Sequence, residues 1–306
     1  MKRYLADFGL LLVGILWGLG FVFVKIGLNE GIDPFYLSSI RFLLGFVALY
    51  LIFRKKVSKI VKRDIKAGIV IGFFQFMGYL TQTYGLTMTT ASKNAFFTAI
   101  NVVIVPYIFW ILHKKKPDIF SFVASIVCLA GVGVISFDAN MNLTDINRGD
   151  ILTIISAFFF AGQIATTGYF SRKIEPMKLI FIQMLVAGIL FLITQFVTTG
   201  VRAFTPLSGV TLVSVIYLVL FSTAIPTLLQ TFCQKATTST RASILMSTES
   251  LFAPLFAFLL LHEVLTLKVI FGAGLILFAV LISETKLGLA KIEAVSYTHL
   301  RAHETV

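Results

Sequence analysis

Long runs of apolar residues, separated by short polar segments, recur along the whole chain. A helix that crosses a lipid bilayer needs about 20 mostly apolar residues. The runs that approach this length predict ten transmembrane helices, at residues 5–24, 35–53, 67–86, 94–112, 118–137, 150–170, 178–198, 211–233, 242–261 and 268–285. The first run is too long for the apolar part of a signal peptide, and no small-residue cleavage site follows it, so we expect it to form the first helix.

The second half of the chain repeats the first after a shift of 148 residues. The shift aligns LTQTYGLTMTTASKN, residues 80–94, with LLQTFCQKATTSTRA, residues 228–242, and Pro106 with Pro254. One extra residue then aligns WILHKKKP with LLLHEVLT. We predict a first repeat at 1–137 and a second at 148–289, each with five helices. Five is odd, so the second repeat enters the membrane in the opposite sense, an arrangement typical of alternating-access transporters.

Composition and charge agree with a membrane protein. The chain is 58% hydrophobic and 13% charged, against roughly 45–50% and about 25% in soluble domains. The net charge of +12 does not indicate nucleic-acid binding, because no basic face with interleaved aromatic residues exists. The gaps on one side of the predicted spans hold 20 lysines and arginines and those on the other hold 4, which places both termini in the cytoplasm of an inner or plasma membrane.

Several other features predict little chemistry. The two cysteines, Cys128 and Cys233, cannot form a disulfide framework. His262-Glu263 belongs to no metal-binding motif, and no phosphate-binding loop occurs. We therefore expect no catalytic residue, metal or cofactor. The polar residues 290–306 have no counterpart in the first repeat, and their EAVSYTHLRAHETV resembles translated adapter sequence, so we expect disorder there and leave their native origin open.

Glu249 is the only acidic residue deep inside a predicted span. An ionisable group at the bilayer centre costs about 2.5–3.5 kcal/mol on insertion scales, so it usually faces a cavity or a partner. Three interpretations stay open. Glu249 couples proton movement to transport, binds a cationic or amine group of a substrate, or forms structural hydrogen bonds only.

Four predicted spans carry polar stripes at helical spacing. Three stripes are Gln75, Tyr79 and Gln82; Asn94, Thr98 and Asn101; and Ser222, Pro226 and Gln230; the fourth span contains Glu249. In lipid such stripes must turn inward, either to line a cavity or to join helices by hydrogen bonds. Our candidates for the substrate-binding cavity are Trp17, Gln75, Tyr79, Gln82, Asn101, Gln163, Gln230 and Glu249.

Three further features have two interpretations each. Trp17 and Gln163, which lie within spans, either form the cavity wall or simply pack. Arg41 is placed near the outer end of its span, where structural pairing or snorkelling toward water is favoured over an anion contact. The pairs Gly14/Gly18 and Gly68/Gly72 fit close helix packing.

Several segments together resemble the drug/metabolite transporter superfamily, EamA type, over about residues 5–285. They are ILWGLGFVFVK, PFYLSSIRFLLG, TTASKNAFFTAINVVIVPYIFWIL, GDILTIISAFFFAGQIA and ILMSTESLFAPLFAFLLLHEVLT. The resemblance implies ten helices in two inverted five-helix repeats around a cavity for small metabolites. The sequence departs from the family pattern at FFFAG, which often has a tryptophan, and at His262, which replaces a glycine.

The resulting hypothesis is an all-α membrane protein that acts as a secondary active permease or exporter. Its substrates would be small metabolites such as amino acids or related compounds, moved by alternating access around a midplane cavity, with proton coupling as an option. The alternatives are a membrane-embedded transferase and a membrane sensor or structural protein that transports nothing. The expected partners are a small-molecule substrate and the lipid bilayer; the sequence leaves open whether the protein forms a homo-oligomer.

Overall fold

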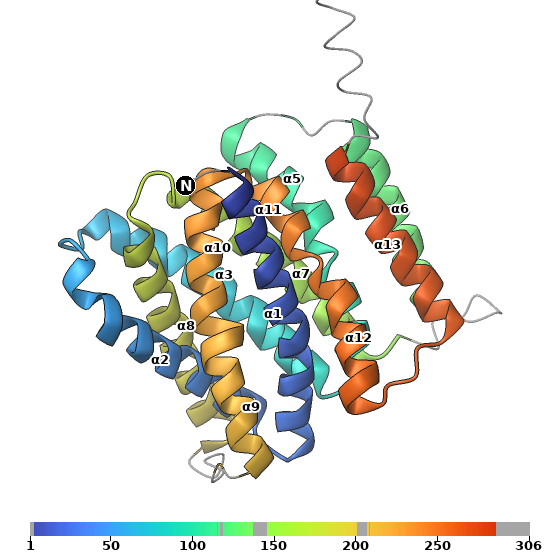
Figure 1. Ribbon diagram of the computed structural model, residues 1–306, viewed down its shortest axis with the longest axis horizontal. Coiled ribbons are helices and arrows are strands. Elements are labelled where there is room, and N and C mark those ends of the chain that lie inside the picture. The colour runs from blue at the N-terminus through green and yellow to red at the C-terminus, as the bar shows by residue number, and fades with distance from the viewer. Residues whose placement is uncertain are drawn as a thin grey trace, which may run out of the picture.

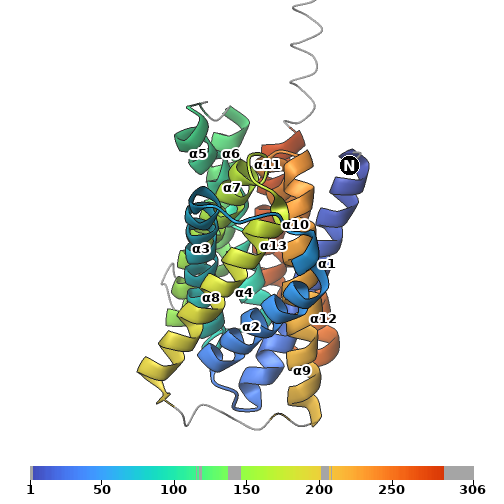
Figure 2. The same ribbon diagram turned by 90° about the vertical axis from the view of Figure 1, so that its left-hand side faces the viewer.

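The structure, a computed structural model, describes residues 3–114, 116, 119–136, 146–200, 207 and 209–285, so the predicted tail at 290–306 lies outside the described residues. These residues form helices and no strand. The helices are α1 (Arg3–Asn29), α2 (Pro34–Phe53), α3 (Lys62–Leu86), α4 (Ala91–Thr98), α5 (Asn101–His113), α6 (Ile119–Ser136), α7 (Arg148–Phe170), α8 (Pro176–Thr198), α9 (Gly209–Val219), α10 (Ile225–Ala236), α11 (Ser239–Met246), α12 (Glu249–Leu261) and α13 (Leu267–Thr285). They run between the two ends of one bundle (Figures 1 and 2), and α1 begins at the end where α13 finishes.

Ten spans are present, as predicted, but three of them are interrupted. α4 with α5, α9 with α10, and α11 with α12 each make one span. By length and composition, seven of the described segments are apolar enough to cross a membrane. The predicted spans at 94–112, 211–233 and 242–261 each correspond to one candidate membrane span, but the apolar pattern that predicted them did not indicate where the regular α-helix is interrupted.

The two repeats have the same backbone at the interrupted spans. α4 and α11 coincide after a shift of 148 residues, and so do α5 and α12. The first helix of each pair has a threonine cap, in which the Thr90 or Thr238 side chain accepts from a backbone N–H three residues on. The second helix ends in the left-handed conformation, with φ of 58° at Lys114 and 53° at His262.

This register corrects one detail of the sequence alignment. The extra residue that pairs His113 with His262 is not needed, since Lys114 and His262 end their helices equivalently. It also gives a reason for the glycine that the resemblance implies at position 262, because glycine adopts a positive φ without steric cost.

The repeats are interleaved. α1 of the first repeat packs against α9, α10 and α12 of the second, while α7 packs against α3 and α5 of the first. Like helices also pair across the molecule: α2 contacts α8, and α6 lies beside α13 at one edge (Figure 1). Each half therefore supplies most of the packing surface of the other.

Glycines allow two of these contacts to be close, as their spacing predicted. A Cβ atom on Gly18 would lie 3.1 Å from the backbone nitrogen of Ala253, and one on Gly72 would lie 2.9 Å from the carbonyl oxygen of Gln183. Backbone atoms cannot yield as a flexible side chain can. α1 thus approaches α12, and α3 approaches α8, at distances that a larger residue would not permit.

Gly72→Ala is therefore expected to destabilise the protein by about 1–3 kcal/mol, the usual cost of overpacking. Gly274→Ala is the matched control, because no atom lies within 4 Å of the added Cβ. Alanine loses less conformational entropy than glycine when it becomes helical, so this variant should be neutral or more stable by about 0.5–1 kcal/mol. Thermal unfolding of the purified protein in detergent would compare them. Equal unfolding temperatures for the two variants would contradict the close-packing account.

Candidate functional site

A cavity with an empty volume of about 630 Å³, part of it open space, lies between the two repeats. Helices of both repeats form its wall. All eight predicted site residues line it: Trp17, Gln75, Tyr79, Gln82, Asn101, Gln163, Gln230 and Glu249. The other lining residues are Gly20, Phe21, Val24, Arg41, Thr83, Leu86, Thr98, Phe160, Ile164 and Ser222.

One wall is organised by a turn of π-helix, Leu220–Ala224, between α9 and α10. Pro226 begins the next helical turn and has no N–H, so the carbonyl of Ser222 four residues earlier cannot receive the usual helical hydrogen bond. The Trp17 indole Nε1 and the Arg41 Nη2 donate to this oxygen instead, both at 3.1 Å. π-turns within helices occur frequently at functional sites.

Arg41 is deep in the protein, not at its surface. The residue is 3% exposed. Its Nε donates to Thr223 Oγ1 at 2.8 Å, and Nη2 also donates to Ser222 Oγ at 2.9 Å. The guanidinium lies 4.6 Å from the centre of the Tyr79 ring and 5.7 Å from that of Phe42. Of the two interpretations favoured for Arg41, structural pairing is therefore confirmed and snorkelling toward water is wrong: the side chain lines the cavity and bonds to the π-turn.

Glu249 lies opposite a chemically different residue of the other repeat. Glu249 is the first residue of α12, as Asn101 is the first residue of α5. Glu249 is 5% exposed, and no hydrogen bond or salt bridge joins its carboxyl group to a residue that the structure describes. Asn101 donates to Thr98 O at 2.8 Å, while its Oδ1 has no partner among the described residues. The interruptions thus present two helix N-termini, where negative groups are stabilised, to the cavity.

The glutamines that line the cavity differ in whether they also bond to neighbouring helices. Gln163 of α7 and Gln230 of α10 bond each other within the second repeat, with Gln230 Nε2 3.0 Å from Gln163 Oε1. Gln82 donates to Thr98 Oγ1 at 3.0 Å. Gln75 is 3% exposed, and its Oε1 has no hydrogen-bond partner in the described part of the chain. Both interpretations of the polar stripes, helix bonding and cavity lining, therefore apply, and they apply together to Gln82 and Gln230.

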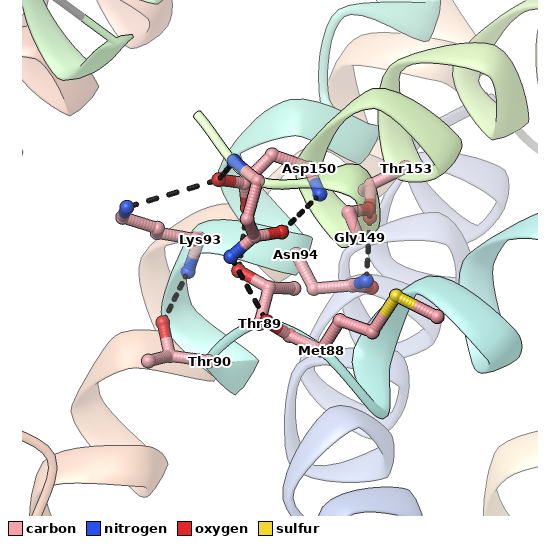
Figure 3. Close-up of polar contacts among 9 residues, drawn as sticks. Met88, Thr89, Thr90, Lys93, Asn94, Gly149, Asp150 and Thr153 are labelled. Carbon is pink, nitrogen blue, oxygen red and sulfur yellow. Dashed lines mark hydrogen bonds and ion pairs between the residues drawn. The ribbon is translucent and has the colours of Figure 1, made fainter. Parts of the chain in front are cut away.

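Two members of the polar stripes do not line the cavity. Asn94 donates to Thr153 Oγ1 at 2.7 Å and to the Gln82 carbonyl, and Figure 3 shows it beside α7. Pro226 contributes indirectly, because it leaves the Ser222 carbonyl free to accept hydrogen bonds from Trp17 and Arg41. The helical spacing placed both on the correct face of their helices but could not reveal which neighbour each one meets.

Aromatic rings complete the wall. Tyr79 stands edge-on to Phe160, with ring centres 5.1 Å apart. Phe160 lies in the FFFAG segment, where a tryptophan was expected from the resemblance. Phe160 and Arg41 are the principal lining residues that the sequence analysis did not select. A charged residue inside an apolar run was a usable signal for Arg41, whereas Phe160 is indistinguishable in sequence from its neighbouring phenylalanines.

Inter-repeat ion pairs close the bundle beyond the cavity. At one end Lys93 of α4 lies 3.8 Å from Asp150 of α7. Thr89 also donates to Asp150, which is fully buried (Figure 3). At the opposite end Arg241 of α11 holds Asp7 of α1 through two bonds of 2.8 and 3.0 Å. Position 93 aligns with position 241 in the repeat, so the two cations are equivalent in place, whereas their acidic partners are not and differ in burial.

Lys25 and Glu263 form further hydrogen bonds between helices at the end of the bundle that contains Lys93. Lys25 Nζ donates to the carbonyls of Leu86 and Thr89, at 2.9 and 2.7 Å. Glu263 accepts from the backbone N–H groups of Ala91 and Ser92 at the start of α4. Glu263 is therefore a helix cap from the other repeat, and Lys25 holds the end of α3.

A second buried ion pair joins α3 to α8 on the side of the N-terminus. Lys178 Nζ lies 3.2 Å from Asp64. Burial alone would raise the pKa of Asp64, but the hydrogen bond from the Val61 N–H and the ammonium of Lys178 outweigh it and hold the pKa below its ordinary value. Asp64 therefore stabilises the fold above the carboxyl's unfolded pKa, and this contribution is lost as the pH falls through the lower folded value.

Comparison with known proteins gives consistent matches. A model of the EamA-like transporter family matches residues 4–137 and again residues 147–285. The chain is 36% identical, over 92% of its length and 86% of the relative, to an uncharacterized transporter of Archaeoglobus fulgidus. It is 27% identical, over 70% of its length and 73% of the relative, to a probable amino-acid metabolite efflux pump of Escherichia coli.

A solved crystal structure has a similar fold. It superposes with a TM-score of 0.67 over 92% of this chain and 96% of the other, at 11% sequence identity. At that identity the likeness concerns the fold alone.

The two ion pairs should differ in their effect on stability. Asp150→Asn removes a charge from a fully buried group with several partners, so we expect a loss of about 3 kcal/mol. Asp7→Asn affects a pair in which the arginine side chain is 39% exposed, so we expect about 1 kcal/mol or less. Thermal unfolding of both variants in one detergent would test this order, and a larger effect of Asp7→Asn would contradict it.

Proposed function

The chain belongs to the EamA-like transporter family, and we propose that it is a secondary active exporter of small metabolites such as amino acids or related compounds. The matched relatives are transporters, so the enzyme alternative is set aside. In the proposed mechanism the two repeats rock about the cavity and expose it to one side of the membrane at a time. The inverted repeat supports this mechanism, since such repeats are the usual basis of alternating access.

The observation that carries the proposal is the polar cavity between the repeats. Buried polar groups inside a membrane protein usually mark a substrate or ion path. Here they come from both halves of the chain, and the carboxyl group of Glu249 faces the cavity without a bond to any described residue. Relative motion of the two halves would therefore change the distances between the polar groups that form the site.

The choice of substrate has two supports. One relative is named as a probable amino-acid metabolite efflux pump. The cavity wall itself combines amide groups, aromatic rings and a few charged groups, a mixture that suits a small polar solute with an apolar part.

We propose an orientation with both termini in the cytoplasm, supported by the excess of lysine and arginine on that side. Single cysteines at exposed positions 30 and 59, in a protein with Cys128 and Cys233 replaced by alanine, would test it. An impermeant maleimide should label the Glu30→Cys variant in intact cells and the Lys59→Cys variant only after lysis. The reverse pattern would overturn this orientation but not the transport proposal.

Glu249 is proposed to couple proton movement to transport. In proteoliposomes that contain the wild-type protein, addition of an amino acid should cause proton movement across the membrane. Glu249→Gln should abolish this proton movement, because a side-chain amide does not take up and release a proton as a carboxyl group does. Glu175→Gln, which changes a carboxyl group outside the cavity, is the matched control and should behave as wild type.

Three outcomes separate the parts of this proposal. Substrate flux without proton movement in Glu249→Gln supports coupling through this residue. Unchanged proton movement in Glu249→Gln excludes it. If the wild-type protein moves no amino acid or related compound, the proposed substrate class is wrong.

A further inference from the structure

We infer that Arg41 binds the carboxylate of a zwitterionic substrate, while Glu249 receives its ammonium group elsewhere on the same cavity wall. This inference rests on the proposed function and adds to it: the substrate is recognised by two opposite charges, and Arg41 determines specificity for free carboxylic acids over their neutral derivatives. Four features of the described residues support it.

The first feature is the hydrogen-bond inventory of Arg41. A guanidinium has five N–H donors: one on Nε and two on each Nη. Nε donates to Thr223 Oγ1, and Nη2 donates to the carbonyl and hydroxyl oxygens of Ser222. These bonds fix the side chain and do not use Nη1; the hydroxyl of Tyr79, which lines the same cavity, is a further partner of the guanidinium, so a bound carboxylate would share the guanidinium with Tyr79.

The second feature is charge. No carboxylate of the described chain lies within salt-bridge distance of Arg41. The rings of Tyr79 and Phe42 offer cation–π contacts, but they carry no net negative charge. A buried cation without a counter-charge is costly, so a cavity lined by this guanidinium favours a ligand that brings an anion.

The third feature is the separation of the two charges. Glu249 lines the same cavity, yet no salt bridge joins it to Arg41. Tyr79 lines the cavity beside Arg41, with its ring centre 4.6 Å from the guanidinium. A purely anionic solute would meet Glu249, and a purely cationic one would meet Arg41. A zwitterion satisfies both.

The fourth feature is a pair of unused acceptors. Gln75 Oε1 and Asn101 Oδ1 are buried, belong to residues that line the cavity, and have no hydrogen-bond partner among the described residues. Buried acceptors of this kind are normally satisfied. An ammonium group has three donors and no acceptor, so it is the kind of ligand group that unused acceptors on this cavity wall would bind.

The test measures binding to the purified full-length protein in detergent. A thermal-shift panel of the twenty amino acids first identifies those that bind. Each one is then compared with its α-amide, which keeps the ammonium group and loses the carboxylate charge, and with its decarboxylated amine. Wild type should prefer the acid by about tenfold or more, the value of one hydrogen bond to a charged group.

Arg41→Gln should bring the ratio of acid to amide affinity close to one while leaving the affinity for the amide nearly unchanged. Arg41→Lys keeps a cation but not the forked donors, so it should retain a reduced preference for the acid over the amide. This variant replaces Arg41→Gln if Arg41→Gln does not elute as a single species in size-exclusion chromatography. Arg172→Gln is the matched control, because that guanidinium binds the Thr237 carbonyl and does not line the cavity.

The outcomes distinguish this inference from the proposed function. If amino acids bind but the acid-to-amide ratio is the same in wild type and in both Arg41 variants, the inference is wrong and the proposed function stands. If no amino acid binds to the wild-type protein, both are wrong. A ratio that falls in Arg41→Gln and only partly in Arg41→Lys supports the inference.

Discussion

The carbonyl oxygen of Ser222 holds the central part of the structure together. It is free because Pro226 has no N–H to give it, and it receives hydrogen bonds from Trp17 of α1 and Arg41 of α2. Two helices of the first repeat are thereby attached to one carbonyl of the second. The same contact orients the guanidinium, which would otherwise be a long and mobile cation inside an apolar bundle. A missing backbone donor thus determines both how the repeats meet and which group faces the cavity.

The duplicated backbone and the unequal side chains have separate roles. The caps at Thr90 and Thr238 and the left-handed helix ends at Lys114 and His262 repeat closely. At the cavity, by contrast, the backbone position that holds Asn101 in one repeat holds Glu249 in the other. Symmetry of the backbone permits two equivalent motions, whereas the difference between an amide and a carboxyl group gives the cavity its charge.

Much of this arrangement could be predicted from the sequence. Ten spans, the inverted repeat and eight cavity-lining residues followed from apolar runs, internal similarity and polar stripes, because a lipid solvent forces polar side chains inward. The interruptions of three spans were not predicted, because a pattern of apolar residues carries no information on the backbone hydrogen bonds within a span. For Arg41 the sequence could not decide between structural pairing and snorkelling, because its partner is the free carbonyl of Ser222, 181 residues away in the chain.

The exchange of packing partners has a consequence for biosynthesis. Helix α3 carries polar groups and close-packing glycines on faces that meet α7 and α8, and α1 meets α9, α10 and α12. A ribosome delivers the first repeat to the membrane before any of these partners exists. Until the second repeat is synthesised, the helices of the first repeat are in the lipid with their glycine faces and amide side chains unpacked. The first half is therefore an incomplete folding unit, which becomes stable only after the second half has been inserted.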